Sequence, residues 1–139
     1  MSTRNHIILL IVLTILLLPL IVLPLSSDHF IFKKKKKTLA EGGNLYFNFI
    51  DIKQPLIYHI FNYLYQIFGY EQILYRLFDL IWQFLTAYSI FLVSYKIIRD
   101  SKIAIWSSII YSMLYVNLHY SQTLQVETLA TLPLLWSIY

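Results

Sequence analysis

Two polar segments hold the residues with which this chain could do chemistry. They contain four carboxylates, Asp28, Glu41, Asp51 and Glu127, and Lys53 lies two residues after Asp51. A carboxylate can act as a general base or hold a hard cation through its oxygen atoms. A lysine beside such groups can hold a phosphate as a point charge. The combination suits a site for a lipid-linked phosphate, although charged loops are usually no more than solvated surface.

The motifs of soluble enzymes do not occur in this sequence. It contains no P-loop, no G-x-G-x-x-G, no G-x-S-x-G and no H-E-x-x-H. Its four histidines are scattered and lack the spacing of metal ligands. There is no cysteine, which excludes disulfides and thiolate metal sites. The carboxylates and Lys53 are therefore the candidate reactive groups.

Long uncharged apolar runs separate the polar segments and must position them. Of the 139 residues, 58% are hydrophobic and 13% are charged, whereas soluble domains are about 25% charged. An apolar run of about 20 residues is long enough to cross a bilayer as a helix. The sequence predicts an all-α, polytopic, multi-pass protein of the cell membrane. Its expected crossings are residues 7–25, 72–98, 103–120 and 128–139.

The first and last runs need separate interpretation. Residues 7–25 are longer than the usual core of a signal peptide, contain Pro19 and Pro24, and precede no A-x-A-like cleavage site. We interpret them as an uncleaved first helix, with a signal peptide as the alternative. Residues 128–139 cover only roughly 18 Å as a helix. We therefore expect the sequence to be the amino-terminal fragment of a larger polytopic protein.

A short apolar stretch, residues 55–68, is bounded by a proline and a glycine, which is typical punctuation for a helix. Its length of roughly 21 Å is less than the apolar core of a bilayer, about 30 Å. Its polar residues His59, Asn62 and Gln66 share one helical face. This pattern predicts a helix in the membrane interface. A buried helix packed against its neighbours is the alternative.

The next helix carries polar residues within its apolar sequence. Arg76, Asp79, Gln83 and Thr86 lie on one face of it. Ionisable groups in a spanning helix face protein or a wet cavity and pair with one another. Arg76 and Asp79 are three residues apart and can pair. A structural ion pair is at least as good an interpretation as a role in a site.

The basic residues set the predicted orientation. If residues 55–68 lie in the interface, Arg4 and the basic turn at 96–102 share one side. The positive-inside rule places that side in the cytoplasm. Segment 26–54 is then an extracytoplasmic loop, and Glu127 faces the same, outer side of the membrane. This arrangement avoids a crossing of only 14 residues and brings the carboxylates to one face.

The lysine block at 33–37 opposes this orientation. If residues 55–68 crossed the membrane, the block and the basic turn would share the cytoplasmic side, and Glu127 would lie on the opposite face. The block also raises the question of a nucleic-acid partner. We expect none, because the lysines lie between apolar segments rather than on a basic domain face. An anionic lipid surface is the better partner.

Several short features follow one another in a characteristic order. The first helix leads to Asp28, and a loop then reads AEGGNLYFNFIDIKQPLIY at residues 40–58. A short helix ends in Phe-Gly, Arg76 follows seven residues after that glycine, and Glu127 opens the last crossing. This order resembles the amino-terminal part of the GT-C membrane glycosyltransferases. The bacterial branch similar to protein O-mannosyltransferases and the aminoarabinose transferase of lipid A is nearest.

The resemblance implies a reaction and assigns roles. A sugar carried on a polyprenyl phosphate lipid moves to an acceptor at the outer membrane face, usually with inversion. Asp28 matches the family's catalytic general base, and Lys53 matches the lysine that binds the donor phosphate. Asp51 and Glu127 are the nearest matches to carboxylates that hold a divalent metal ion in members that use one. Arg76 matches a family arginine whose role is structural.

The fragment lacks the further crossings of such enzymes, so we expect it to be inactive alone. It departs from the family pattern at His29, where glutamate is common, and at Asn48, where some relatives carry aspartate. The alternative function is that of a non-enzymatic membrane protein or inactive fragment. Such a protein would bind anionic lipid through residues 33–37.

Overall fold

A computed structural model describes residues 3–25, 55–69, 71–118 and 120–139. Over these ranges the chain forms helices and no strand, so the predicted all-α class is confirmed there. The elements are α1 (Thr3–Leu17), the 3-10 helix η1 (Leu18–Val22), α3 (Pro55–Phe68), α4 (Gln72–Ile98), α5 (Ser101–Val116), the 3-10 helix η2 (Tyr120–Gln122) and α6 (Val126–Ile138).

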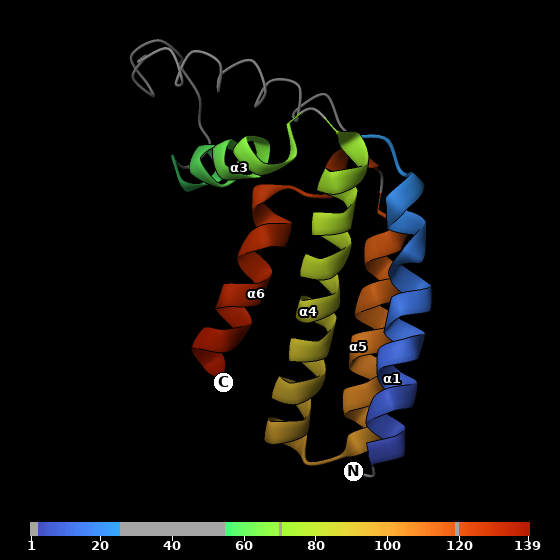
Figure 1. Cartoon of the computed structure of the whole chain (residues 1–139). Helices are drawn as coiled ribbons and strands as arrows, with labels where there is room; N and C mark the ends of the chain where they lie inside the picture. The colour runs from blue at the N-terminus through green and yellow to red at the C-terminus, as the bar shows by residue number, and fades with distance from the viewer. Residues whose placement is uncertain (1–2, 26–54, 70, 119) are drawn as a thin grey trace.

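The long helices form a bundle with α4 at its centre. Figure 1 shows α1, α4, α5 and α6 running side by side, with α3 lying across the end of the bundle where α6 begins. Helix α4 packs against α1, α5 and α6, and α1 also packs against α5. The end of η1, which precedes segment 26–54, and α3, which follows it, therefore lie at the same end of the bundle as the start of α6.

Helix α4 is the strongest candidate for a membrane crossing. Its 27 residues span about 40 Å at the usual rise of a helix. Among the residues that the structure describes, it is the one helix long and apolar enough to cross a membrane. The apolar stretch His6–Val22 is shorter. The structure thus supports one crossing, and the multi-pass arrangement stays a prediction.

The first helix differs from the prediction of one continuous helix over 7–25. It begins at Thr3, is α-helical only to Leu17, and tightens into η1 around Pro19. Proline has no N–H to donate within a helix, and its ring opposes continuation of the preceding α-helical turns. Two later segments also differ in their bounds. Helix α5 ends at Val116 rather than 120, and α6 begins at Val126 rather than 128.

A tight turn joins α4 to α5. Arg99 adopts a left-handed conformation with φ of 58° and ends α4. The side chain of Asp100 then caps α5, accepting the backbone N–H of Lys102 at 2.7 Å and of Ile103 at 3.4 Å. The turn gathers the exposed Lys96, Arg99 and Lys102 at the end of the bundle away from α3.

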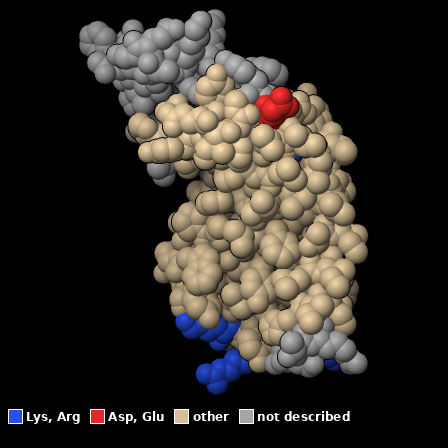
Figure 2. Space-filling view, in the orientation of Figure 1, with Lys and Arg blue, Asp and Glu red and all other residues tan. Residues whose placement is uncertain are grey.

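The surface between the two ends of the bundle is uncharged. On the face in Figure 2, lysine and arginine gather at one end, an acidic side chain lies at the other, and uncharged residues cover the middle. Exposed apolar side chains on three helices include Ile7, Ile11, Ile15, Ile73, Leu77, Ile81, Leu85, Ile103, Ile110 and Met113. A contiguous apolar exterior of this kind suits lipid better than water.

A proline in α6 explains one contact between α6 and α4. Pro133 lies inside α6 and has no N–H for the carbonyl oxygen of Leu129, four residues earlier. The indole Nε1 of Trp82 in α4 donates to that oxygen at 3.2 Å instead. Closer to the end of α6, the Nε1 of Trp136 donates to Ser89 Oγ of α4 at 3.1 Å. These two hydrogen bonds, one from each indole, connect α6 to α4 at two points along their length.

Candidate functional site

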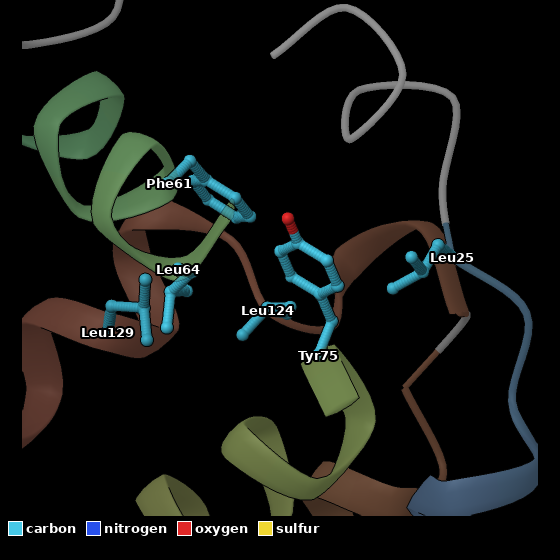
Figure 3. Close-up of a cluster of buried hydrophobic side chains, with 6 residues drawn as sticks. All are labelled: Leu25, Phe61, Leu64, Tyr75, Leu124 and Leu129. Carbon is cyan, nitrogen blue, oxygen red and sulfur yellow. The ribbon is translucent and has the colours of Figure 1, made fainter. Parts of the chain in front are cut away.

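A buried cluster joins the segments that carry the predicted site residues. We call it the junction cluster, and Figure 3 shows its six side chains. They are Leu25, Phe61, Leu64, Tyr75, Leu124 and Leu129. These residues come from the chain after η1, from α3, from the start of α4, from the turn before α6 and from α6 itself. The two flanks of segment 26–54 therefore meet the first turns of α6.

Helix α3 lies on this cluster with one face and turns its polar face away. Phe61 and Leu64 are buried in the cluster, whereas His59 and Gln66 are exposed and Asn62 is half-buried. The polar stripe expected from the sequence is thus present on the outer side of the helix. The helix also packs against its neighbours through Phe61 and Leu64, although Tyr63 and Ile67 are exposed, so it is not the fully buried helix of the alternative interpretation. Its position in a membrane interface stays a prediction.

Below the junction cluster lies a buried network of polar side chains centred on Arg76. The Nε of Arg76 donates to the carbonyl oxygen of Leu23 at 2.9 Å. One terminal nitrogen donates to Asp79 Oδ2 at 3.2 Å and to Thr123 Oγ1 at 2.9 Å. The other terminal nitrogen donates to the carbonyl oxygen of Pro24. Arg76 thereby connects the chain after η1 with the turn before α6.

Asp79 is the acceptor that balances this arginine. Its side chain, like that of Arg76, has no exposed surface. Besides Arg76, the carboxylate accepts the hydroxyl of Tyr115 at 2.8 Å and the amide Nε2 of Gln83 at 3.3 Å, both at Oδ1. The predicted pairing of Arg76 with Asp79 is confirmed. A buried charge pair of this kind persists only when its other hydrogen-bonding groups are also satisfied.

Two tyrosines of α5 complete the network. Tyr111 donates to Gln83 Oε1 at 2.6 Å, and Tyr115 donates to Asp79. The hydroxyl of Tyr115 also accepts the backbone N–H of Leu124 at 3.0 Å. Leu124 is fully buried and has a left-handed backbone with φ of 56°, a conformation that costs on the order of 1–3 kcal/mol for such a residue. Tyr115 therefore helps to hold a strained turn before α6.

The network stabilises the packing of the helices and is not arranged as a ligand-binding site. Its two charged side chains pair with each other, and both are closed off from the exterior. The sequence identified Arg76, Asp79 and Gln83, but it missed Tyr115 and Thr123. The signal for Tyr115 was the pair Tyr111 and Tyr115, one helical turn apart in α5, which had to be matched to the polar face of α4.

The predicted catalytic and binding residues fall mostly outside this part of the chain. Asp28, Asp51 and Lys53, together with Glu41 and residues 33–37, lie outside the described residues. Glu127 is described, and it is exposed in the first turn of α6. A carboxylate there is favoured by the partial positive charge of a helix amino terminus.

A metal site is not assembled from the described ranges alone. Within them, no three histidine, aspartate or glutamate side chains lie together as ligands for a metal ion. Glu127 would need carboxylates from segment 26–54, such as Asp51. The metal-binding role of Asp51 and Glu127 therefore stays a prediction.

Comparisons of the chain with protein-family models, curated proteins and solved structures find no match. The resemblance to GT-C glycosyltransferases therefore rests on the ordered sequence features themselves.

Proposed function

We propose that this chain is the amino-terminal part of a membrane glycosyltransferase. It would transfer a sugar from a polyprenyl-phosphate donor to an acceptor at the extracytoplasmic face of the cell membrane. The junction cluster is the observation that carries the proposal, because it includes Leu25 and Leu129 together. Asp28 follows Leu25 by three residues, which limits the separation of their Cα atoms to about 11 Å. Glu127 precedes Leu129 by two residues in α6.

The distribution of charge supports the orientation of this site. The exposed Lys96, Arg99 and Lys102 lie at the end of the bundle opposite α3. By the positive-inside rule, an end rich in lysine and arginine favours the cytoplasmic side. The end that holds the junction cluster would then face outward, where a lipid-linked sugar donor of this class is used. The lysine block at 33–37 counts against this orientation, which the proposal keeps because it brings Asp28 and Glu127 to one side.

The proposed transfer uses Asp28 as the base. Its carboxylate takes the proton of the acceptor hydroxyl as that oxygen bonds to the anomeric carbon of the sugar. The bond between the anomeric carbon and the phosphate oxygen breaks, and the polyprenyl phosphate leaves with the electron pair. The ammonium group of Lys53 stabilises the charge that develops on this phosphate. Attack from the side opposite the leaving group inverts the anomeric centre.

The test compares two Asp→Asn variants of the full gene product in membranes. Donors are radiolabelled polyprenyl-phosphate sugars, beginning with mannose and aminoarabinose. We expect Asp28→Asn to lower sugar transfer by about 10²–10⁴-fold, the usual contribution of a general base. Asp100→Asn is the matched control, because asparagine also caps a helix well and Asp100 lies at the other end of the bundle.

Two results would count against the proposal. Transfer that survives Asp28→Asn at the control rate would remove Asp28 from the role of base. Absence of transfer from every donor, with binding of anionic vesicles lost when residues 33–37 are neutralised, would favour the non-enzymatic alternative.

A further inference from the structure

Two chain segments that lead into the predicted site share hydrogen bonds to one arginine. On one side, Arg76 donates to the carbonyl oxygens of Leu23 and Pro24, the two residues immediately before Leu25. On the other side, Arg76 donates to Thr123 Oγ1, at the turn that precedes α6. A single guanidinium group thus contacts both the entry to segment 26–54 and the entry to α6.

A second connection runs through the carboxylate of Asp79. Asp79 fixes the hydroxyl of Tyr115, and that hydroxyl accepts the N–H of the left-handed Leu124. Thr123 adds a bond from its own hydroxyl to the carbonyl oxygen of Tyr120 at 2.8 Å. The turn before α6 is therefore held at two adjacent residues, once by Arg76 and once by Tyr115.

We infer that Arg76 and Asp79 are positioning residues that hold the chain entering segment 26–54 at a fixed distance from the chain entering α6. The inference rests on the proposed function only for the groups that are positioned, namely Asp28, three residues after Leu25, relative to Glu127 in α6. The mechanical link itself stands on the hydrogen bonds between Arg76, Asp79 and the two chain segments.

The chemistry of the link makes it stiff. A guanidinium group is planar and presents its donors in a fixed fork, so its partners cannot shift independently without losing a bond. The bonds of Arg76 to Asp79 and Thr123, and that of Asp79 to Tyr115, are buried, so a donor or acceptor that loses its partner there gains no water in exchange. The chain at Leu23–Leu25 and the chain entering α6 are consequently connected through the Arg76 network as well as through the junction cluster.

Tyr115 and Tyr111 provide a matched pair for testing the link. Both donate a hydroxyl into the network from α5, one helical turn apart. Only the hydroxyl of Tyr115 also contacts the backbone of the turn before α6, at Leu124. Tyr115→Phe therefore removes a hydrogen bond to that turn, whereas Tyr111→Phe removes a hydroxyl of the same kind whose partner, Gln83, lies in α4.

The measurement is an EPR distance between spin labels in lipid nanodiscs. The chain has no cysteine, so Val22→Cys and Gln122→Cys label two exposed positions beside the two tethered segments. We expect Tyr115→Phe to widen the distance distribution at least about twofold, and Tyr111→Phe to leave it unchanged. Labels at Ile11→Cys and Ile110→Cys, in the middle of the bundle, should report no change in either variant.

Thr123→Val is the second variant, since it removes the acceptor for Arg76 while keeping the shape of the side chain. If Tyr115→Phe does not fold, the same EPR distance is measured in Thr123→Val instead. An unchanged width for Val22 and Gln122 in the folded variant would overturn the inference. So would equal widening at the Ile11 and Ile110 pair, which would indicate general loosening of the bundle.

Sugar transfer separates this inference from the proposed function. Widening in Tyr115→Phe without transfer from any donor would sustain the link and reject the glycosyltransferase. Transfer that is lost in Asp28→Asn, with no widening in either Tyr115→Phe or Thr123→Val, would sustain the enzyme and reject the link.

Discussion

At the residue scale, the pairing of Arg76 with Asp79 explains how two charged side chains occur within an otherwise apolar helix. Both are fully buried and bonded to each other at 3.2 Å. Each also bonds to neutral groups from the neighbouring segments, among them Leu23 and Tyr115. Loss of one partner would leave an uncompensated charge in the bundle, which is much more costly than loss of both.

We therefore expect Asp79→Asn to lower the free energy of unfolding by about 3–5 kcal/mol. The double variant Arg76→Met, Asp79→Leu should lose clearly less, because no charge stays buried without a partner. Denaturant titration in detergent micelles, followed by circular dichroism, measures both values. A double variant less stable than Asp79→Asn would contradict this account of the pair.

At the element scale, α6 depends on α4 because Pro133 leaves a carbonyl oxygen free within the helix. Trp82 supplies the missing donor to Leu129, and Trp136 adds a second contact at Ser89. A buried carbonyl oxygen without a partner costs about 1–3 kcal/mol. The indole of Trp82 thus compensates for a proline in a different helix.

This dependence predicts a coupling between Trp82 and Pro133. Trp82→Phe should destabilise the protein, because phenylalanine cannot donate to Leu129. In a Pro133→Ala background, the alanine N–H can bond to Leu129 within α6, so the same substitution should cost about 1 kcal/mol less. A double-mutant cycle from denaturant titrations measures this difference. Strict additivity of the two substitutions would show that Trp82 does not compensate for the proline.

Local patterns predicted the elements better than the contacts between them. The proline and glycine that bound residues 55–68 predicted the extent of α3, and residue spacing predicted the polar face that holds Arg76 and Asp79. The roles of Tyr115 and Thr123 depend on how α5 and its following turn pack against α4. Such contacts join residues far apart in the chain, and no short pattern in this sequence specifies them.

At the scale of the whole molecule, the exposed charged side chains among the described residues lie near the two ends of an apolar bundle. Figure 2 shows this arrangement on one face, and the fully buried Arg76 and Asp79 leave the middle of the surface uncharged. The sequence predicted this exterior from composition, and it predicted that segment 26–54 and Glu127 share one side. The structure brings Leu25 and Leu129 into one cluster, whereas the shared side of segment 26–54 and Glu127 stays a prediction, because Asp28, Asp51 and Lys53 lie outside the residues it describes.

The most direct test of that shared side is cysteine labelling in intact cells. Three single-cysteine variants are sufficient, Asn44→Cys in segment 26–54, Gln122→Cys before α6 and Lys102→Cys in the basic turn. We predict that an impermeant maleimide labels the first two in intact cells and Lys102→Cys only after the membrane is opened. Labelling of Asn44→Cys and Gln122→Cys from opposite sides of the membrane would contradict the proposed site.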